Sequence, residues 1–599
     1  MDRPTKRPRI APRRGGGRWR PGARALLAIP WLLLLLAPGP ADPPDLPSRD
    51  PLWFGTYARH AVAADHAEAS AAGLELLREG GNAADAAAAT MLALGVANPA
   101  SSGLGGGGFA LYYRASDRSL TFLDFRERAP GAASAEMYRD APELGGPMSG
   151  ASQLGGLATA VPGEAAGIAA LVERFGALPL ARSVQPAIRL AEGGVAVSGP
   201  LARVSEIFGS QLRQDPQTRR WFEPGEASLR EGQTLRQPAL GRTLRAFARG
   251  GRDAFYRGRI AREIVRANRR AGGILTLEDL RDYEVVEREP LEAERFGHRW
   301  VTAPPPSAGG FTLLQSLAML ERLPAAWRAP GDRLLHALAE SWKGPFLDRQ
   351  RYFGDPDHVD LPLEALGDPS RAAARARAFH PQLAMPAEDY ELPLGPAPAI
   401  QQPEGGGTSH LCVIDSEGNI ASITTTVNLP FGARYAAAGI VMNDEMDDFA
   451  RGVGESNAFG LVGGASNLPG PFRRPVSTMS PTIVFGPDGA PILCVGAAGG
   501  SRIVTAVEQI ALNVLVLEMG LQEAMAAPRV HHQGRPDALR SEEKAPLPEQ
   551  ILALLRARGH RIEPISNVAS AQAIRILPGD RRRLEAACDP RKGGRPAGE

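Results

Sequence analysis

A threonine that follows three glycines has the clearest potential for chemistry in this sequence. Gly405–Gly407 precede Thr408, and the alternating residues 411–414, closed by a turn at 415–419, predict a strand. Glycine permits positive φ and leaves room for a side chain to approach the preceding carbonyl. A cut at Gly407–Thr408 would give Thr408 a hydroxyl nucleophile and an α-amine, of near-neutral pKa, that can take its proton. A flexible linker that enters an edge strand is the alternative interpretation.

Charged side chains elsewhere offer possible ligands for a substrate. Glu445, Asp447 and Asp448 form a carboxylate cluster, which by itself suits a metal ion, an exposed acidic loop or an ammonium group. Arg126 ends a predicted strand that begins at Phe122. An arginine at such a place is either a solvated surface charge or a ligand whose planar donor fork matches a carboxylate.

Two adjacent glycines lie at a predicted turn from strand to helix. Gly499 and Gly500 follow a strand predicted at 492–495 and precede a helix that starts near Ser501. Backbone N–H groups at such a turn lie at the positive end of the helix, which suits a developing oxyanion. Simple steric need is the other explanation for two glycines here.

The elements that must position these groups begin with a helical hairpin. Ala67–Glu79 has apolar residues at helical spacing, and Asn82 can cap an alanine-rich helix that ends near Leu94. A glycine run at 103–108 then leads into a strand predicted at 109–113. The run contains G-x-G-x-x-G, but a dinucleotide fingerprint requires a strand before it and a helix after it. We therefore reject a nucleotide site.

Composition describes a globular protein of one or two large cores. The chain has 599 residues, with 68 Lys and Arg against 66 Asp and Glu, so its net charge of +2 indicates no nucleic-acid partner. Three cysteines are too few, and odd in number, for a disulfide framework, and we expect Cys412 and Cys494 to be small buried apolar residues. Asp348, Asp355 and Asp357 lack the spacing of a calcium loop and are interpreted as solvated loop charges.

Residues 1–41 have the pattern of a signal peptide. Five arginines between positions 13 and 24 precede the apolar run 25–37, and small residues at 39–41 offer a cleavage point. We expect export to the periplasm or the medium. The alternative is an uncleaved anchor, which would be the chain's contact with a membrane.

Over residues 55–594 the chain resembles the gamma-glutamyltransferase (gamma-glutamyltranspeptidase) family of N-terminal-nucleophile hydrolases. Four motifs in the family's order carry the resemblance: Thr408-Ser409-His410, Asn443-Asp444-Glu445-Met446-Asp447-Asp448-Phe449, Arg474-Pro475-Val476-Ser477-Thr478-Met479-Ser480-Pro481-Thr482 and Gly499-Gly500-Ser501-Arg502. The implied fold is α/β (α+β), a four-layer αββα sandwich, in which the glycine run passes tightly into the central sheet. Self-cleavage at Gly407–Thr408 is implied to give a large subunit, 42–407, and a small catalytic subunit, 408–599, which remain together as a heterodimer.

The resemblance also implies a role for each site residue. Thr408 would attack the γ-glutamyl amide of glutathione or a related compound, and water or an amino acid or peptide acceptor would resolve the acyl-enzyme. The implied partners of Thr408 are Thr426, which hydrogen-bonds the nucleophile, Asn428, which contacts the substrate, and Gly499 and Gly500, which hold the oxyanion. Arg126, Ser477 and Thr478 would bind the α-carboxylate, and Glu445 and Asp448 the α-ammonium. No cofactor is implied, and His531-His532 lacks the spacing of a metal pair.

Two alternatives remain open at this point. One is an acylase of the same fold that acts on glutaryl-β-lactams or poly-γ-glutamate. The other is a binding protein on an inactive enzyme fold, against which Thr408, Arg126 and Asp448 speak. The sequence departs from the family's usual residues at Ser409 and Thr478, which both keep a hydroxyl, and at Phe459, where some members have a lid tyrosine.

Overall fold

The computed structural model describes residues 52–139, 150–395, 407–450, 464–579 and 582–599. Two seven-stranded sheets form its centre, and their strand pairs are antiparallel. In order across the first sheet the strands are β1 (Phe54–Tyr57), β20 (Arg583–Cys588), β19 (Ser570–Leu577), β15 (Pro491–Ala498), β14 (Thr482–Phe485), β9 (His298–Thr302) and β8 (Leu291–Arg295). In order across the second they are β21 (Ala597–Gly598), β2 (Ala61–Ala64), β10 (Gly407–Ile414), β11 (Ile420–Asn428), β3 (Gly107–Arg114), β4 (Ser119–Phe125) and β7 (Val286–Arg288).

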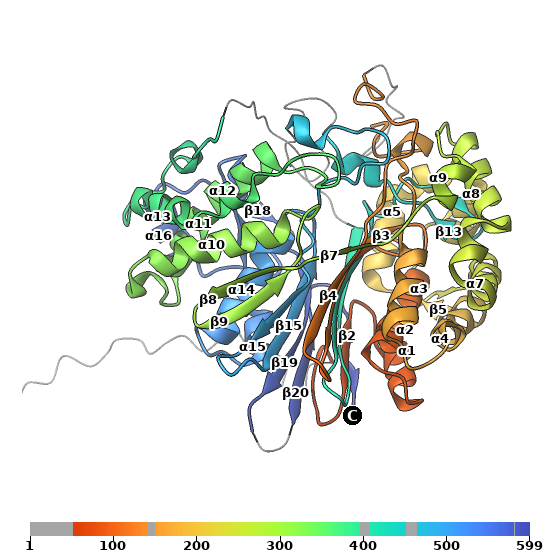
Figure 1. Cartoon of the computed structure of the whole chain (residues 1–599), viewed down its shortest axis with the longest axis horizontal. Helices are drawn as coiled ribbons and strands as arrows, with labels where there is room; N and C mark the ends of the chain where they lie inside the picture. The colour runs from red at the N-terminus through yellow and green to blue at the C-terminus, as the bar shows by residue number, and fades with distance from the viewer. Residues whose placement is uncertain (1–51, 140–149, 396–406, 451–463, 580–581) are drawn as a thin grey trace, which may run out of the picture. The chain divides into compact units, whose positions relative to one another are not determined.

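Helices cover the outer face of each sheet, so the molecule has four layers (Figure 1). The helices beside the second sheet are α1 (Ala67–Arg78), α2 (Ala83–Ala97), α3 (Glu164–Phe175), α4 (Leu180–Gly193), α7 (Pro238–Tyr256) and α8 (Arg259–Arg270). Those beside the first are α10 (Gly309–Arg322), α11 (Asp332–Tyr352), α13 (Pro369–Ala378), α14 (Arg502–Leu515), α15 (Leu521–Ala526) and α16 (Glu549–Ala557). The αββα architecture expected from the resemblance is confirmed.

Further short elements complete the connections. The helices among them are α5 (Gly199–Leu212), α6 (Pro216–Phe222), α9 (Leu277–Arg281) and α12 (Leu363–Gly367). The strands are β5 (Val195–Ala196), β6 (Thr234–Leu235), β12 (Ala436–Ala437), β13 (Ile440–Val441), β16 (Val530–His531), β17 (Leu539–Glu542) and β18 (Ile562–Ile565). Within the described ranges, no helix is both long and apolar enough to cross a membrane.

Two hydrophobic cores hold the layers together. One lies between the second sheet and its helices, and the other fills the space between the two sheets and extends to the helices of the first. The predicted hairpin is confirmed: α1 ends at Arg78, and the Asn82 side chain accepts from the N–H groups of Ala84 and Asp85 to begin α2. Nearly all of α2 is buried, because alanine lets it approach its neighbours closely.

The glycine run at 103–108 passes very close to the backbone of β11 at Thr426. A Cβ atom on Gly106 would lie 1.8 Å from the carbonyl oxygen of Thr426, which is far inside van der Waals contact. Strand β3 begins directly afterwards, at Gly107, and pairs with β11. Glycine is therefore required here by close backbone approach, and no nucleotide fingerprint is present.

Candidate active site

Thr408 lies at the start of β10, at a break in the strand's register. Strand β10 pairs with β11, with Thr408 opposite Thr426, and the register shifts between Gly407 and Thr408. Such bulges re-aim side chains and are frequent next to active sites. The carbonyl of Thr408 accepts from Lys592 Nζ at 2.7 Å, which fixes the strand from the C-terminal end of the chain. The bond expected to be cut therefore occupies an irregular, well-held backbone position.

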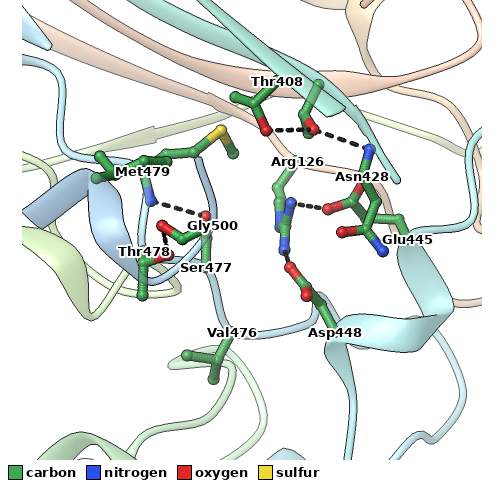
Figure 2. Close-up of a pocket in the computed structure, with 12 residues that line it drawn as sticks. Arg126, Thr408, Asn428, Glu445, Asp448, Val476, Ser477, Thr478, Met479 and Gly500 are labelled. Atoms are coloured by element: carbon green, nitrogen blue, oxygen red, sulfur yellow. Dashed lines mark hydrogen bonds and ion pairs between the residues drawn. The ribbon is translucent and has the colours of Figure 1, made fainter. Parts of the chain in front are cut away.

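Thr426 links the expected nucleophile to the expected scissile carbonyl. Its hydroxyl lies 3.1 Å from Thr408 Oγ1 and donates to the carbonyl oxygen of Gly407 at 2.8 Å (Thr408 is labelled in Figure 2). Because a hydroxyl carries one proton, Thr408 is the donor in the Thr408–Thr426 pair. The N–H of Asn428 also donates to Thr426 Oγ1, at 2.8 Å. Thr426 thus hydrogen-bonds both the Thr408 hydroxyl and the carbonyl that precedes Thr408.

The Arg126 pocket brings together most of the residues predicted for the site. It is lined by Arg126, Thr408, Thr426, Asn428, Glu445, Asp448, Val476, Ser477, Thr478, Met479, Gly500 and Ile503, as Figure 2 shows for most of them. These side chains come from segments more than 300 residues apart. The remaining cavity is about 20 Å³, which is room for about one water molecule.

Arg126 fills the pocket with ion pairs to two carboxylates. Its Nη1 contacts Glu445 Oε1 at very short range, and its Nη2 donates to Asp448 Oδ2 at 2.5 Å. A third carboxylate, Glu127, lies 3.8 Å from Nη1 and is completely buried. The Arg126 guanidinium therefore faces three acidic groups, and the charge of a second buried arginine, Arg349, also acts on Asp448.

Burial controls the protonation of these acids. It raises the pKa of Glu445 to about 7, although the charge of Arg126 acts in the opposite direction. It also raises the pKa of Asp448, and it raises that of Glu127 together with the nearby charge of Glu445. For Arg126 burial lowers the pKa, but the three carboxylates outweigh it and keep the guanidinium charged.

A zwitterion fits this pocket better than any singly charged group. To enter, it would have to separate Arg126 from Glu445 and Asp448, because the cavity of about 20 Å³ holds about one water molecule; its carboxylate would then face the guanidinium and its ammonium the two carboxylates. Each buried charge then keeps an opposite partner, which avoids the large cost of an uncompensated buried ion. An α-amino acid has this pair of charges on one carbon.

The hydroxyls of Ser477 and Thr478 lie at the far side of the same pocket. Ser477 Oγ accepts from the N–H of Met479 at 3.1 Å, and Thr478 Oγ1 donates to the carbonyl of Gly500 at 2.9 Å. In this state Thr478 positions the turn at Gly500, and it would have to rotate to donate to a ligand. Asn428 reaches the pocket with its amide held by the carbonyl of Asp444 at 3.0 Å.

Gly499 and Gly500 form the turn from β15 into α14, as predicted. Their φ values are 148° and 61°, and a Cβ on Gly499 would lie 2.8 Å from Ala569 Cα. Steric need therefore does explain glycine at this turn. The carbonyl of Gly499 accepts from Arg502 Nε, and the carbonyl of Gly500 accepts from Thr478 Oγ1. The turn comes just before the N-terminal, positive end of α14. The steric explanation considered for the sequence is confirmed, and the oxyanion role of the two N–H groups stays a prediction.

A second cavity, the cationic pocket, also opens on Thr408. It encloses about 240 Å³. Its lining consists of Asn98, Ala100, Ser101, Pro200, Arg203, Val204, Thr408, Pro430, Ala498, Gly499, Arg502, Lys544, Ser566, Asn567, Ser570, Arg591 and Lys592. Thr408 thus stands between two cavities, with Gly500 lining one and Gly499 the other.

The interpretation of three aspartates as solvated loop charges was wrong for Asp348 and Asp355, which are buried, whereas Asp357 is an exposed loop residue. Asp348 lies inside α11 and accepts from Arg371 and Arg375, each at 2.8 Å. Asp355 is buried and accepts from the backbone N–H of Arg474 at 2.7 Å, and Asp357 pairs with Arg288. The arginine partners of Asp348 and Asp357 lie 23 to 69 residues away in the sequence, where no local pattern could reveal them.

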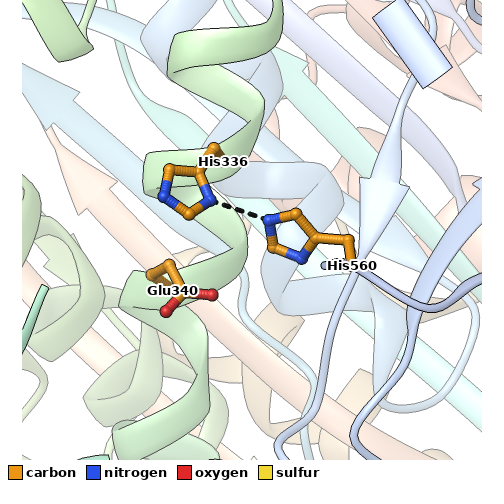
Figure 3. A group of neighbouring side chains, drawn as sticks. All are labelled: His336, Glu340 and His560. Atoms are coloured by element: carbon orange, nitrogen blue, oxygen red, sulfur yellow. Dashed lines mark hydrogen bonds between the residues drawn. The ribbon is translucent and has the colours of Figure 1, made fainter. Parts of the chain in front are cut away.

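One group of side chains in the described ranges has the spacing of metal ligands. His336 and Glu340 lie one turn apart on α11, and His560 completes a buried triangle whose ligand atoms lie within 4.8 Å of one another (Figure 3). Protein groups already occupy these atoms. His336 Nδ1 and His560 Nε2 lie 2.7 Å apart, and Glu340 accepts from Lys343 at 2.8 Å and from Tyr390 at 2.6 Å. The group is complete as a structural hydrogen-bond network.

The paired histidines at 531–532 and the buried cysteines also have structural environments. His531 Nδ1 lies 2.9 Å from Thr505 Oγ1, and His532 Nε2 lies 3.0 Å from Asp537 Oδ1. Cys412 and Cys494 are free and fully buried, as expected. Phe459, residues 1–41 and the segment 396–406 before the predicted cut lie outside the described residues.

Sequence reasoning missed three contributors to the surroundings of Thr408. Glu127 is adjacent to Arg126 but was treated as a plain strand-end charge, and Lys592 lies near the C-terminus, 184 residues from its partner Thr408. Arg203 lines the cationic pocket from α5. Of the three, Glu127 alone could have been found from the local sequence, because it is adjacent to Arg126. The sequence around Lys592 and Arg203 has no such signal.

Comparisons with known proteins agree with this geometry. The family described as Gamma-glutamyltranspeptidase matches residues 69–599. A glutathione hydrolase proenzyme of Escherichia coli K12 is 38% identical over 536 residues, which cover 88% of this chain and 90% of the relative. A cephalosporin acylase from Bacillus halodurans superposes with a TM-score of 0.80 at 27% identity, covering 94% of this chain and 99% of that one.

A gamma-glutamyltranspeptidase structure from Helicobacter pylori is 33% identical with a TM-score of 0.51, and the match covers 54% of this chain and 92% of that one. The matched residues begin within α1 and include every strand of the two sheets except β1 and β2, as well as both cavities beside Thr408. The chain therefore belongs to the gamma-glutamyltranspeptidase family.

Proposed function

We propose that this chain is a self-processing γ-glutamyltransferase that cleaves the γ-glutamyl amide of glutathione and related compounds. It passes the glutamyl group through Thr408 to water or to an amino acid or peptide. The single observation that carries the proposal is the Arg126 pocket, where a guanidinium faces buried carboxylates directly beside the Thr408 hydroxyl. The names of relatives, glutathione hydrolase proenzyme among them, support the same activity.

Processing begins with Thr408 Oγ1 and the carbonyl carbon of Gly407. The hydroxyl oxygen forms a bond to this carbon, the Gly407–Thr408 C–N bond breaks, and the nitrogen takes the hydroxyl proton. Water then hydrolyses the resulting ester, which leaves a Gly407 carboxylate and a free Thr408 hydroxyl and amine. The Thr426 hydroxyl, 2.8 Å from the Gly407 oxygen, stabilises the charge that develops on it. The products are 42–407 and 408–599.

Turnover repeats the attack on an external amide. The new α-amine takes the Thr408 proton as Oγ1 attacks the γ-carbonyl, and the N–H groups at Gly499 and Gly500 hold the oxyanion. The leaving amine takes a proton and departs, and an acyl-enzyme ester remains. Water or the amine of an acceptor then attacks this ester and restores Thr408.

The charges of the Arg126 pocket favour γ-glutamyl over glutaryl substrates. A glutaryl group brings a carboxylate for Arg126 but no ammonium for Glu445 and Asp448, which would remain buried without the guanidinium. Leaving one partner of a buried ion pair alone typically costs about 3–5 kcal/mol. The alternative is an acylase, and the similarity to the cephalosporin acylase structure is the reason to test it. An acylase of this kind would prefer the glutaryl substrate.

One assay tests the proposal directly. Purified protein is offered a γ-glutamyl anilide with and without a dipeptide acceptor, and a glutaryl anilide in parallel. We expect release of the aniline from the γ-glutamyl compound, faster with the acceptor. A preference for the glutaryl compound would support the acylase alternative instead.

We also propose that residues 1–41 direct export and are removed. The arginine-rich start and apolar run support this, and an uncleaved anchor is the alternative. N-terminal sequencing of the large subunit from fractionated cells distinguishes the two. A start near residue 42 in the soluble periplasmic or culture fraction is expected.

A further inference from the structure

Lys592 makes a direct contact with the residue that both pockets share. Its ammonium nitrogen, Nζ, donates to the backbone carbonyl of Thr408 at 2.7 Å. The mechanism proposed above uses the Thr408 hydroxyl and the α-amine that cleavage creates, and no step of it uses the charge of this lysine. A cation thus contacts the nucleophilic residue without an assigned role in the reaction.

The turn between β20 and β21 holds Lys592 in place. Its neighbour Arg591 pairs with Asp589 at 3.2 Å, and the N–H of Arg591 donates to the same carboxylate at 3.0 Å. Lys592 Nζ also donates at 2.5 Å to the buried carboxylate of Asp65, which directly follows β2. The ammonium is therefore held at two points, on Asp65 and on Thr408.

Cleavage converts the backbone nitrogen of Thr408 into an α-amine close to this ammonium. The backbone N and O atoms of one residue are at most about 3.6 Å apart, so Lys592 Nζ lies within about 6 Å of Thr408 N. A like charge at such a distance disfavours the protonated form of an amine. The base must be unprotonated when the hydroxyl attacks. Lys592 therefore carries its charge where it favours the reactive form of the base.

The other charged groups around Thr408 differ between its two sides. The cationic pocket has no aspartate or glutamate in its lining, and its cations besides Lys592 are Arg203, Arg502, Lys544 and Arg591. The charged groups on the other side are Arg126, Glu127, Glu445, Asp448 and Arg349, whose charge acts on Asp448. The carboxylates there face arginines, whereas the ammonium of Lys592 contacts Thr408 itself.

We propose that Lys592 is a positioning residue for the nucleophile, which holds the backbone of Thr408 and keeps the new α-amine in its free-base form. Lys592 acts through Thr408, by its hydrogen bond and by its charge. The inference rests on the proposed function, because it names the group that keeps the base of that reaction ready.

The pH profile of kcat/KM for a γ-glutamyl anilide tests the charge of Lys592 separately from its hydrogen bond. Lys592→Gln keeps a hydrogen-bond donor but removes the charge, and Lys592→Arg keeps both. Asp65→Asn keeps the shape of the side chain but removes the negative charge that offsets part of the Lys592 charge. Arg220→Gln is the control for net charge, because Arg220 is an exposed arginine on α6 that lines neither pocket.

The expected result is a shift of the acidic limb of this profile. Without the nearby positive charge the amine is protonated more easily, so the limb should move up by about one pH unit in Lys592→Gln. Below the limb, kcat/KM should therefore fall about tenfold, and at alkaline pH it should change much less. Lys592→Arg and Arg220→Gln should keep the wild-type limb, and Asp65→Asn should move it down. Glu445 is present in all five proteins, so its own titration does not alter the comparison.

A second measurement follows the amine without a substrate. Cyanate reacts with the free-base form of an amine, so the pH dependence of carbamylation at Thr408 reports the protonation of this amine directly. Mass spectrometry of the N-terminal peptide of the small fragment measures it. The same upward shift of about one pH unit is expected in Lys592→Gln.

Four outcomes decide against the proposal or separate it from the proposed function. A Lys592→Gln enzyme that is slower at every pH, with an unmoved acidic limb and carbamylation profile, overturns the proposal and makes Lys592 purely structural. An equal shift in Arg220→Gln assigns the effect to net charge, which also overturns it. If Lys592→Gln is not cut, Asp65→Asn decides, and an unmoved limb there overturns the proposal. A wild type that is cut at Thr408 but does not turn over the anilide removes the proposed function, and the carbamylation profiles still decide the role of Lys592.

Discussion

The two cavities that meet at Thr408 differ in size and in how their charges are balanced. The Arg126 pocket has a cavity of about 20 Å³, and its guanidinium is held by Glu445 and Asp448. The cationic pocket encloses about 240 Å³, and its lining has five cationic side chains and no aspartate or glutamate. A closed pocket of paired charges admits one arrangement of ligand charges, whereas a roomy one tolerates many shapes. We therefore expect narrow selection of the acyl donor and broad selection of the acceptor.

The largest effect should come from the residue that both pockets share. Thr408→Ala removes the attacking oxygen, so we expect a single uncut chain and a loss of activity of at least about 10⁴-fold, as for nucleophiles in other acyl-transfer enzymes. Gel electrophoresis and N-terminal sequencing check this, with a wild-type small fragment that begins at Thr408. Thr408→Ser keeps a hydroxyl and should still be cut. An uncut but active wild type would contradict the mechanism.

A smaller but selective effect should follow from a change confined to the Arg126 pocket. Asp448→Asn keeps the shape of the side chain but removes the charge that Arg126 and the substrate ammonium share. Losing such a buried charged contact costs about 2–5 kcal/mol, or roughly thirty-fold to several thousand-fold in kcat/KM for a γ-glutamyl anilide. Self-cleavage should persist, because it involves no free amino acid.

Asp448→Asn also tests whether the two pockets act independently on their ligands. Turnover of a glutaryl anilide should fall much less, and the KM for a dipeptide acceptor should stay near the wild-type value. If Asp448→Asn leaves γ-glutamyl turnover unchanged, the carboxylate cluster is not an ammonium site.

The pH dependence should differ between the two pockets. Burial raises the pKa of Glu445 to about 7, so below this pH Glu445 is neutral and cannot pair with an ammonium. The inhibition constant of L-glutamate should therefore rise up to about tenfold per pH unit as the pH falls from 7 to 5. Glu445→Gln should bind more weakly throughout and flatten this dependence. The lining of the cationic pocket has no aspartate or glutamate, so acceptor affinity should not share this dependence.

Local sequence patterns predicted helices, strands and turns, whereas the ion pairs could be identified only from the folded structure. The cap at Asn82, the strand after Thr408 and the turn at Gly499 follow from propensity and spacing over a few residues. Arg126 meets Glu445 across 319 residues, and no local rule predicts that contact. The roles expected for Arg126, Glu445 and Asp448 came from the resemblance and remain predictions.

The interpretation from sequence was wrong where a charged residue expected in solvent is in fact buried. Asp348 was interpreted as solvated because aspartates usually are, but α11 places it against Arg371 and Arg375. The network of His336 and His560 passed unnoticed because 224 residues separate the two rings. Both cases depend on tertiary packing, which also brings Arg203 and Lys544 to one cavity.

The order of strands in the two sheets has a consequence for the life of the processed enzyme. Strand β2 lies between β10 and β21, and strands β14, β15, β19 and β20 lie between β1 and β9, so segments from both sides of residue 407 alternate. Once cut, the two chains cannot part without breaking both sheets, and dilution alone should not separate them. Cleavage does change what happens after the enzyme unfolds. Precursor folding is a first-order event, but two fragments would have to meet again in solution, so thermal inactivation should be irreversible at low concentration and governed by the rate of unfolding.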